Sequence, residues 1–261
     1  MTRHDEVYGD AELAALYDLA YGDYDDDLDL YEQFASRGEL PSLELAVGSG
    51  RVALHLARAG HRIVGIDASL AMLARCEAAL DAQTAPNVRL VEADMRDFSL
   101  GEQFDVVYCA FDSFEQMLTN EDAFAALRCA ERHMAKGGLF VTELRTLRSI
   151  DWSPPDQAPL AYEWTRTDGR TGERITKLSS MRASPASQTT TTTLIFDRLA
   201  SDGAVRRRTL DVTLRVFGRQ EFELLLARAG LRTAHVYGDY DLSPLTDDSD
   251  TMIVVADREG T

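Results

Sequence analysis

Two short runs between residues 43 and 67 contain the residues whose types and spacing could do chemistry. The first, LELAVGSGR, joins an apolar strand pattern to Gly48 and Gly50, and residues 52–59 then have helical apolar spacing. A strand, a glycine turn and a helix in this order present free backbone N–H groups to a ligand. The second run, IVGID, ends in Asp67, about 20 residues after the glycines, where Rossmann-type folds place the acid that binds ribose hydroxyls. Together the runs predict a nucleoside site.

The glycine pattern alone leaves more than one enzyme class open. The run GSGRVA, residues 48–53, satisfies the loose dinucleotide pattern G-x-G-x-x-G/A, so an NAD-dependent oxidoreductase fits it nearly as well as other nucleotide-binding enzymes. The wider arrangement separates these classes. An acid, Glu44, lies inside the first strand, and the strand at residues 88–92 is followed by Asp94 and Met95.

The elements that must position these residues alternate between strand and helix as far as residue 149, and Gly137 and Gly138 are expected to precede a strand at residues 139–144. This alternation predicts a parallel sheet with helices on both faces. After Ile150 the chain changes to β-branched or alternating runs, which predict three or four antiparallel strands. These runs are residues 162–167, 174–182, 189–199 and 204–216, and a helix at 220–229 and strands at 233–237 and 252–256 close the chain.

Three units follow from this order. Amphipathic helices at residues 11–20 and 28–37 form an expected N-terminal helical unit, residues 1–40. The cofactor-binding core is expected at 41–149 and 217–261. The inserted β subdomain is expected at 150–216, where it roofs the substrate site or makes oligomer contacts.

The complete pattern resembles the class I S-adenosylmethionine-dependent methyltransferases, and it does so over nearly all of the chain. It is most similar to the small-molecule branch that modifies amino sugars and other secondary metabolites, as in antibiotic biosynthesis. The first motif of that family normally reads like LELGCGTGR, so Ala46 replaces its first glycine. The resemblance implies an α/β fold with a Rossmann-like, doubly wound, seven-stranded sheet whose last strand is antiparallel. It also implies S-adenosyl-L-methionine as cofactor and S-adenosyl-L-homocysteine as product.

The resemblance also assigns the cofactor contacts. Gly48 and Gly50 leave room for the amino acid and ribose parts, Asp67 accepts the ribose hydroxyls, and Asp94 accepts the adenine amino group beside the Met95 backbone. The methyl group of Ala46 is expected to shift a backbone contact or to lower the affinity modestly. The complete expected set is Tyr21, Glu44, Ala46, Gly48, Gly50, Arg51, Asp67, Ala68, Asp94, Met95 and Cys109.

The resemblance implies that the N-terminal helical unit is a lid over the bound cofactor, and that the methyl-transfer residues come from this lid and from the loop after the fourth strand. In the run YDLAY, Tyr17 or Tyr21 is expected to close the site. Cation–π attraction between either ring and a sulfonium cation would contribute about 0.5–2 kcal/mol. Several sugar N-methyltransferases carry a histidine where this chain has Gln116, and a glutamine cannot act as a base at neutral pH. An amine held about 3–3.5 Å from the methyl carbon gains much of its acceleration from proximity. The expected catalytic residues are Tyr8, Tyr17, Phe114 and Gln116, and the expected substrate contacts are Phe111, Ser113, Arg145, Tyr162, Trp164 and Tyr240.

Composition limits the partners. The 44 acidic and 27 basic residues give a net charge of −17, which disfavours nucleic acid and membrane surfaces. The many carboxylates near the expected mouth favour a cationic or amine-bearing acceptor, although a solvated acidic surface explains them equally well. The three cysteines match no metal spacing, and the N-terminal residues form no apolar signal segment, so we expect no metal and a cytoplasmic location.

The function expected from these observations is methylation of a small molecule, with nitrogen preferred over oxygen. Three alternatives stay open: a small-molecule O-methyltransferase, an NAD-dependent oxidoreductase and a non-catalytic cofactor-binding protein. Inserted sheets in the branch that this chain resembles often make dimer contacts, so the resemblance also implies a homo-oligomer.

Overall fold

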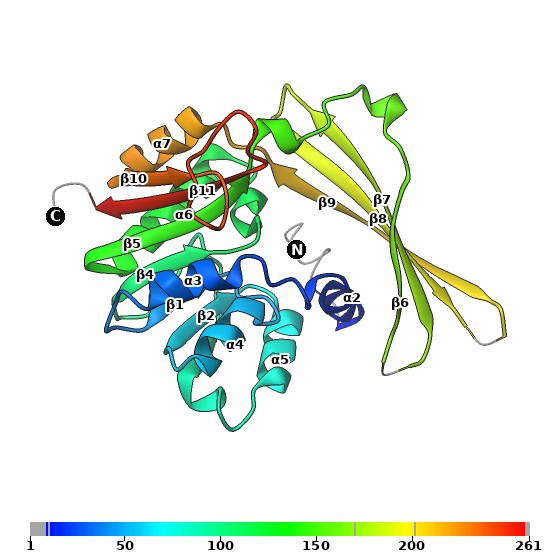
Figure 1. Ribbon diagram of the computed structural model, residues 1–261, viewed down its shortest axis with the longest axis horizontal. Helices are drawn as coiled ribbons and strands as arrows, with labels where there is room; N and C mark the ends of the chain where they lie inside the picture. Colours follow the sequence, from blue (N-terminus) through cyan, green and yellow to red (C-terminus); the bar gives the residue numbers. More distant parts are fainter. Residues whose placement is uncertain (1–8, 10, 170, 201, 259–261) are drawn as a thin grey trace.

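A seven-stranded sheet forms the centre of the molecule, with the strand order β10-β11-β5-β4-β1-β2-β3 (Figure 1). The computed structural model describes residues 9, 11–169, 171–200 and 202–258. The last strand is antiparallel to both of its neighbours, so the expected fold class is confirmed. The strands are β1 (Ser42–Leu45), β2 (Ile63–Asp67), β3 (Val88–Glu92), β4 (Phe104–Cys109), β5 (Met134–Arg145), β10 (Leu231–Tyr237) and β11 (Thr251–Arg258).

Helices cover both faces of this sheet. Helices α6 and α7 pack into one buried cluster with β1 and β4, and α3 and α4 pack into a second cluster on the other face. Because both faces are covered, every residue of β1 and β2 is buried. The helices are α2 (Ala11–Tyr21), α3 (Leu28–Ala35), α4 (Arg51–Arg58), α5 (Leu70–Ala79), α6 (Asn120–His133) and α7 (Arg219–Arg228).

The inserted segment forms a separate four-stranded antiparallel sheet, and α2 lies between it and the core (Figure 1). The threonine run at residues 189–193 is a central part of this sheet, since it pairs with β7 on one side and with β9 on the other. Its strand assignment from β propensity is therefore confirmed. The strands are β6 (Ala161–Thr167), β7 (Arg174–Ser184), β8 (Thr189–Leu199) and β9 (Val205–Arg215).

Strand β5 departs from the sequence-based expectation. Gly137 and Gly138 were expected to precede this strand, but it begins at Met134 and contains both glycines. Its pairing with β4 shifts register between residues 104 and 106, and Gly137 has a φ of +78°. A bulge of this kind inserts extra residues without ending the pairing, and glycine accepts the unusual backbone angle.

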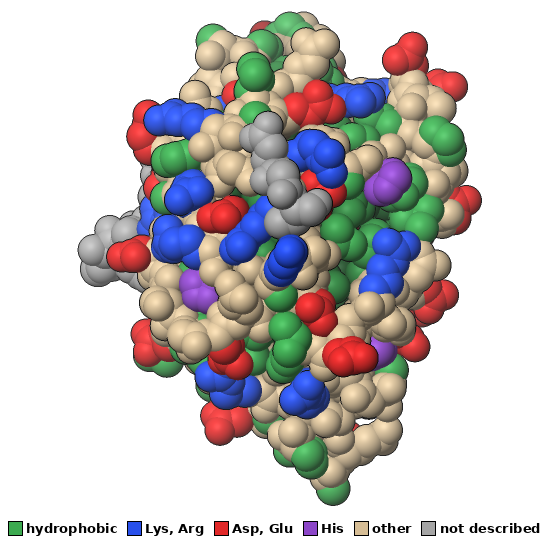
Figure 2. All heavy atoms as spheres, turned by 90° about the vertical axis from the view of Figure 1, so that its left-hand side faces the viewer, with side chains coloured by type: hydrophobic (Ala, Val, Ile, Leu, Met, Phe, Trp, Pro, Cys, Tyr) green, Lys and Arg blue, Asp and Glu red, His purple; other side chains and the backbone are tan. Residues whose placement is uncertain are grey.

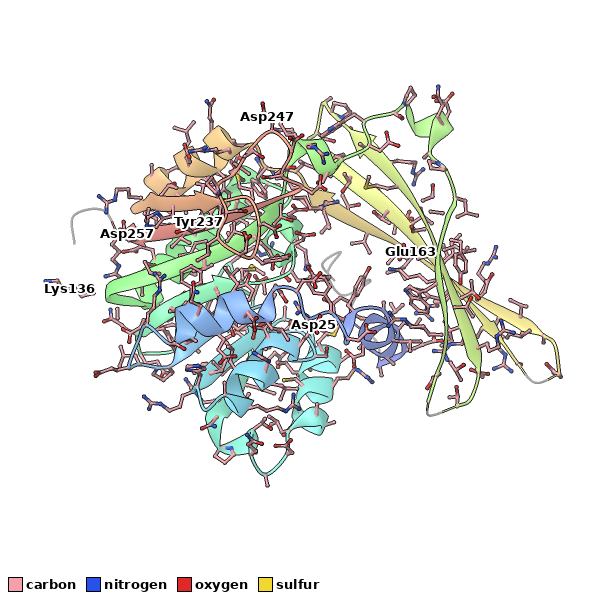
Figure 3. The ribbon with its side chains drawn as sticks, viewed as in Figure 1. Asp25, Lys136, Glu163, Tyr237, Asp247 and Asp257 are labelled. Atoms are coloured by element: carbon pink, nitrogen blue, oxygen red, sulfur yellow. The ribbon has the colours of Figure 1, made fainter. Side chains whose placement is uncertain are left out.

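The edge of the sheet where the parallel strands begin lies away from the site described below. Figure 3 places Lys136, near the start of β5, and Asp257, near the end of β11, at this same edge, as an antiparallel pair requires. Figure 2 shows that acidic and basic side chains are interspersed on this side of the molecule. Across the described part of the chain, each helix is too short or too polar to cross a membrane.

Gly50 can be tested as the residue that lets α4 pack on α5. Its φ is +89°, and a Cβ built there would overlap Cys76 Sγ. We expect Gly50→Ala to lower the free energy of unfolding by about 1–3 kcal/mol beyond the backbone cost, because overpacking a core costs about that much. Chemical denaturation measures this loss.

Gly60→Ala is the matched control, because Gly60 has a similar φ of +93° but no atom within 4 Å of the built Cβ. Adding Cys76→Ala to Gly50→Ala removes the overlapping sulfur and should restore part of the lost stability. Equal losses in Gly50→Ala and Gly60→Ala would contradict the packing argument.

Candidate functional site

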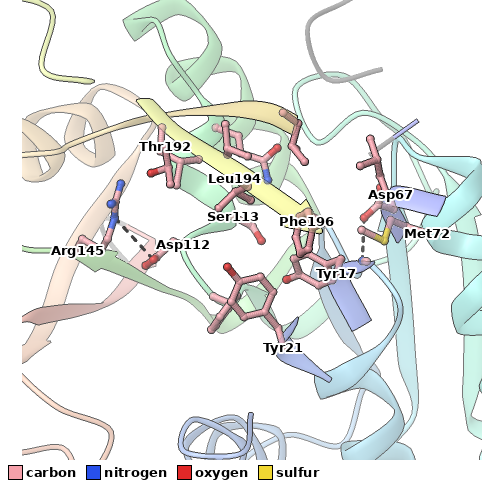
Figure 4. A pocket seen from close by; sticks show the side chains of 18 residues that line it. Tyr17, Tyr21, Asp67, Met72, Asp112, Ser113, Arg145, Thr192, Leu194 and Phe196 are labelled. Atoms are coloured by element: carbon pink, nitrogen blue, oxygen red, sulfur yellow. Dashed lines mark hydrogen bonds and ion pairs between the residues drawn. The ribbon is translucent and has the colours of Figure 1, made fainter. Parts of the chain in front are cut away.

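A cavity of about 310 Å³ opens where the carboxyl ends of the core strands meet α2 and the inserted sheet (Figure 4). Its walls come from the glycine loop after β1, the ends of β2 and β5, helices α2 and α5, the loop after β4, and strands β8 and β9. A volume of this order is typical of the smaller ligand pockets. The lining residues are Leu13, Tyr17, Tyr21, Ala46, Gly48, Asp67, Met72, Phe111, Asp112, Ser113, Gln116, Arg145, Thr192, Leu194, Phe196, Leu210, Val212 and Leu214.

Asp67 is fixed at this cavity by two backbone donors. The Gly48 N–H donates to its Oδ2 and the Ser69 N–H to its Oδ1, each at 2.8 Å. A carboxylate offers about four lone-pair positions. Both oxygens of Asp67 can therefore accept a further hydrogen bond, which suits the two hydroxyls of a ribose.

The glycine loop brings its backbone close to the same space. Gly48 has a φ of +57°, and a Cβ built there would meet no atom within 4 Å, so its backbone faces open cavity. Ala46 also lines the cavity, with a φ of +54° in the left-handed region. This conformation explains why related sequences carry glycine there: an alanine costs about 1–2 kcal/mol in it.

The two lid tyrosines line the opposite wall. The rings of Tyr17 and Tyr21 lie 5.1 Å apart, centroid to centroid. Lys177 Nζ donates to the Tyr21 hydroxyl at 2.7 Å, lies 4.5 Å from the centre of the Tyr21 ring and pairs with Glu163 at 2.6 Å. One lysine of the inserted sheet therefore fixes Tyr21, and it is almost fully buried. Tyr8 lies outside the described residues.

The loop after β4 is shaped by a buried carboxylate of β5. Glu143 Oε1 accepts the Phe111 N–H at 2.5 Å and the Tyr31 hydroxyl at 3.0 Å, and its Oε2 accepts the Tyr240 hydroxyl at 2.5 Å. Burial raises the pKa of Glu143 to about 7, and the nearby negative charge of Asp27 adds to this rise. These contacts hold Phe111 at a φ of +55° with its ring in the cavity.

Arg145 anchors the end of the loop that follows Phe111. Its backbone N–H and its Nε donate to Glu115 at 2.7 Å each, and its Nη2 donates to Thr190 at 3.0 Å. The Asp112 carboxylate lies 3.8 Å from the Arg145 guanidinium (Figure 4). Burial and the neighbouring Glu115 raise the pKa of Asp112 to about 7, while Arg145 opposes this rise.

Comparison with known proteins agrees with this geometry. Residues 43–138 match the family model described as a methyltransferase domain. The dTDP-3-amino-3,4,6-trideoxy-alpha-D-glucopyranose N,N-dimethyltransferase of Streptomyces venezuelae is 29% identical over 199 residues, which are 75% of this chain and 77% of that protein. The cypemycin N-terminal methyltransferase of a Streptomyces species is 27% identical over 225 residues, 83% of this chain and 82% of that protein. The CcbJ methyltransferase of Streptomyces caelestis superimposes with a TM-score of 0.75 and 23% identity, over 89% of this chain and 95% of that one.

Residues 43–138 match a methyltransferase domain, and the protein is an S-adenosylmethionine-dependent methyltransferase. The methyltransferase expected from the sequence is thereby confirmed, and the oxidoreductase and non-catalytic alternatives are set aside. The cofactor fits the residues present. Asp67 offers acceptors for two hydroxyls, and the Gly48 backbone leaves space beside them.

The structure brings only part of the expected cofactor set to the cavity, namely Tyr21, Ala46, Gly48 and Asp67. Asp94 lies outside the lining, and its carboxylate accepts from Arg96, which also binds Asp122. Met95 and Cys109 are buried in the core, whereas Ala68 is exposed.

The methyltransferase motif also contains residues that act at a distance from the cavity. Glu44 is buried beneath the loop and accepts the Tyr108 hydroxyl at 3.0 Å. Arg51 makes a two-bond pair with the fully buried Asp27, at 2.5 and 2.7 Å, and so joins the start of α4 to the residue before α3. Gly50 serves the packing against Cys76.

Among the expected catalytic and substrate residues, Tyr17, Phe111, Ser113, Gln116 and Arg145 line the cavity. Phe114 does not, because its ring is buried among Phe140, Phe217 and Phe222. Trp164 is not among the lining residues; it packs against Phe196 on the same face of the inserted sheet, beside α2. Tyr240 is bound to Glu143, as described above.

Tyr162 is 65% exposed and lies away from the cavity. The pairing of β6 with β7 is irregular between residues 162 and 164. A shift of this kind changes which face of the sheet a side chain occupies.

The sequence-based reasoning missed Asp112, Met72, Leu13 and the lining residues of β8 and β9. Asp112 lies in the same run, CAFDSFEQML, whose neighbours were selected. The lining residues of β8 and β9 could have been predicted from the alternation of side chains, since every second residue of an antiparallel strand faces one side.

Replacing Ala46 should test the strained loop. We expect Ala46→Gly to bind S-adenosylhomocysteine more tightly, by about two- to tenfold, because it removes a methyl group from the cavity wall. Relief of the left-handed alanine, worth about 1–2 kcal/mol, should appear in the stability of the protein instead. Calorimetric titration measures this change.

Gln188→Gly is the matched control for Ala46→Gly, because Gln188 has a φ of +52° in a turn outside the cavity. Gln188→Gly also relieves a left-handed backbone conformation, but it should leave the affinity for S-adenosylhomocysteine unchanged. An unchanged or weaker affinity in Ala46→Gly would show that the alanine does not limit binding.

Glu44 predicts a pH dependence of stability. Burial raises its pKa from 4.5 to about 8, so between these values the folded state holds a proton that the unfolded state has lost. The free energy of unfolding must therefore fall as the pH rises through this range. We expect Glu44→Gln to show a smaller fall in melting temperature between pH 5 and pH 8, roughly the range over which this proton is held.

The exposed Glu92 supplies the control. Glu92→Gln should keep the wild-type pH dependence. The same slope in Glu44→Gln and wild type would mean that Glu44 titrates normally in the folded protein.

Proposed function

We propose that this methyltransferase transfers a methyl group to the nitrogen of a small-molecule amine. The observation that supports this most directly is that one cavity joins Asp67 and the glycine loop to Tyr17, Gln116 and Arg145. A cofactor bound through Asp67 would share an enclosed space with an acceptor bound beside the loop after β4. The relatives named as an amino-sugar N,N-dimethyltransferase and an N-terminal methyltransferase support nitrogen as the acceptor atom.

When bound, S-adenosylmethionine would supply a methyl group activated by its positively charged sulfur, for in-line transfer to the lone pair of the acceptor. The chain contributes mainly by holding the acceptor and excluding water, since orientation of the reacting groups can account for several kcal/mol, roughly 7–11 at best. Gln116 can donate or accept a hydrogen bond to orient the acceptor, but it cannot take a proton.

The lid contributes an aromatic surface to this site. A positive charge over a tyrosine ring gains about 0.5–2 kcal/mol. Because Lys177 already lies over the ring of Tyr21, we assign contact with the cofactor's charged sulfur region to Tyr17. Tyr21 then acts as the residue that holds the lid against the inserted sheet.

Asp67→Asn tests the cofactor site. The amide nitrogen of asparagine would face either the Gly48 or the Ser69 N–H, and a charged acceptor for the ribose is lost. We expect the dissociation constant for S-adenosylhomocysteine to rise by roughly 10- to 100-fold, as loss of a charged hydrogen bond implies. Calorimetry measures binding, and a thermal melt checks that the variant folds.

Asp257→Asn removes the same charge at the opposite edge of the sheet, where Asp257 pairs with Arg232 (Figure 3). It should bind like wild type. Wild-type affinity in Asp67→Asn would refute the role given to Asp67.

A further inference from the structure

Apart from Thr192, the side chains that the inserted sheet presents to the cavity are apolar. Leu194 and Phe196 of β8, with Leu210, Val212 and Leu214 of β9, line it, and we call these five residues the apolar wall. Leu194 pairs directly with Leu210, and Val212 and Leu214 lie two and four residues further along β9. Strand alternation therefore places them on one face, toward the cavity. A ligand with an apolar body would bury this surface.

The other end of the cavity carries an uncompensated acid. Two carboxylates, those of Asp112 and Glu115, share the single guanidinium of Arg145. Glu115 holds the short contacts, at 2.6–2.7 Å, whereas Asp112 lies at 3.8 Å and lines the cavity. With both acids ionised, Asp112, Glu115 and Arg145 together have a net charge of −1. A cationic ligand group would neutralise this charge.

The same residues disfavour a sugar nucleotide, which is the acceptor class in the names of three relatives. Among the described residues that line the cavity, Arg145 is the one cation, and Glu115, Thr190 and Asp112 already surround its guanidinium. Proteins usually bind diphosphates with available arginines, lysines or backbone N–H groups. An acceptor diphosphate would meet the Asp112 charge and the apolar wall instead.

We propose that the acceptor is a small amine on an apolar body, bound as its ammonium ion to Asp112 with the body against the apolar wall. This inference rests on the proposed function and specifies its substrate class. Asp112 would be a catalytic residue, since it touches the reacting nitrogen.

The proton balance is simple. The ammonium gives one proton to the Asp112 carboxylate and keeps the lone pair that forms the new N–C bond, and the S–C bond electrons stay on sulfur, which becomes neutral. The raised pKa of Asp112 supports this role, because the carboxyl can hold a proton near neutral pH. The charged and titratable groups around it are Glu115 and Arg145 nearby, Glu143 on β5, and Tyr17 and Tyr21 of α2.

Binding to the complex with S-adenosylhomocysteine tests the proposal, with hexylamine, hexanol and thymidine diphosphate as probes. We expect hexylamine to bind roughly tenfold or more tightly than hexanol, because an ion pair to a partly buried carboxylate adds to the same apolar contact. Thymidine diphosphate should not bind at concentrations at which hexylamine saturates the site.

Asp112→Asn should abolish the preference for hexylamine over hexanol. Asparagine suits the left-handed φ of +55° at this position, so the variant should keep its fold. The matched control is Asp197→Asn, which removes a charge from the inserted sheet at its ion pair with Arg207, outside the cavity. Leu194→Thr should weaken hexylamine more than butylamine, because it alters the apolar wall.

The outcomes distinguish a failure of the proposed function from a failure of the proposed acceptor class. Loss of S-adenosylhomocysteine binding in wild type would contradict the assigned cofactor and with it the proposed function. Normal cofactor binding with no hexylamine binding, with equal affinity for hexylamine and hexanol, or with binding of thymidine diphosphate would overturn this inference alone. An unchanged preference in Asp112→Asn would overturn it as well.

Discussion

The site depends on buried carboxylates that accept backbone N–H groups from neighbouring loops. Asp67 of β2 holds the loop after β1 through Gly48, and Glu143 of β5 holds the loop after β4 through Phe111. Glu115 in turn holds the end of β5 through Arg145. A charge buried without such partners would cost several kcal/mol. Each acid therefore requires the loop that it positions, and the loops define the cavity.

Local sequence patterns were sufficient for the core. The glycines and Asp67 belong to one strand, turn and helix, and their geometry is set by backbone conformation within about twenty residues, as such motifs are. The β-branched runs identified the inserted strands, the threonine run at 189–193 included, because side-chain shape favours a pleated strand. The bulge at Gly137 escaped notice because glycine pairs more often end a strand than interrupt one.

Contacts between distant segments could not be derived in this way. Lys177 and Tyr21 are 156 positions apart in the sequence, and nothing in the local sequence around either residue indicates that they form a hydrogen bond. Asp112 was passed over because its importance comes from Arg145 and Glu115, whose positions depend on the packing of β5 against the loop. Phe114 was selected for its place in a motif, but the direction of its ring is decided by the aromatic residues of the core.

Helix α2 is attached on both sides. Asp18 pairs with Arg75 of α5, while Arg166 of the inserted sheet donates to the Leu19 carbonyl at 2.6 Å and Lys177 donates to Tyr21 at 2.7 Å. Moving the helix away from the core alone would break the first contact and carry the inserted sheet with it. A displacement of α2 that kept its two contacts with the inserted sheet would therefore move the helix and that sheet as one unit.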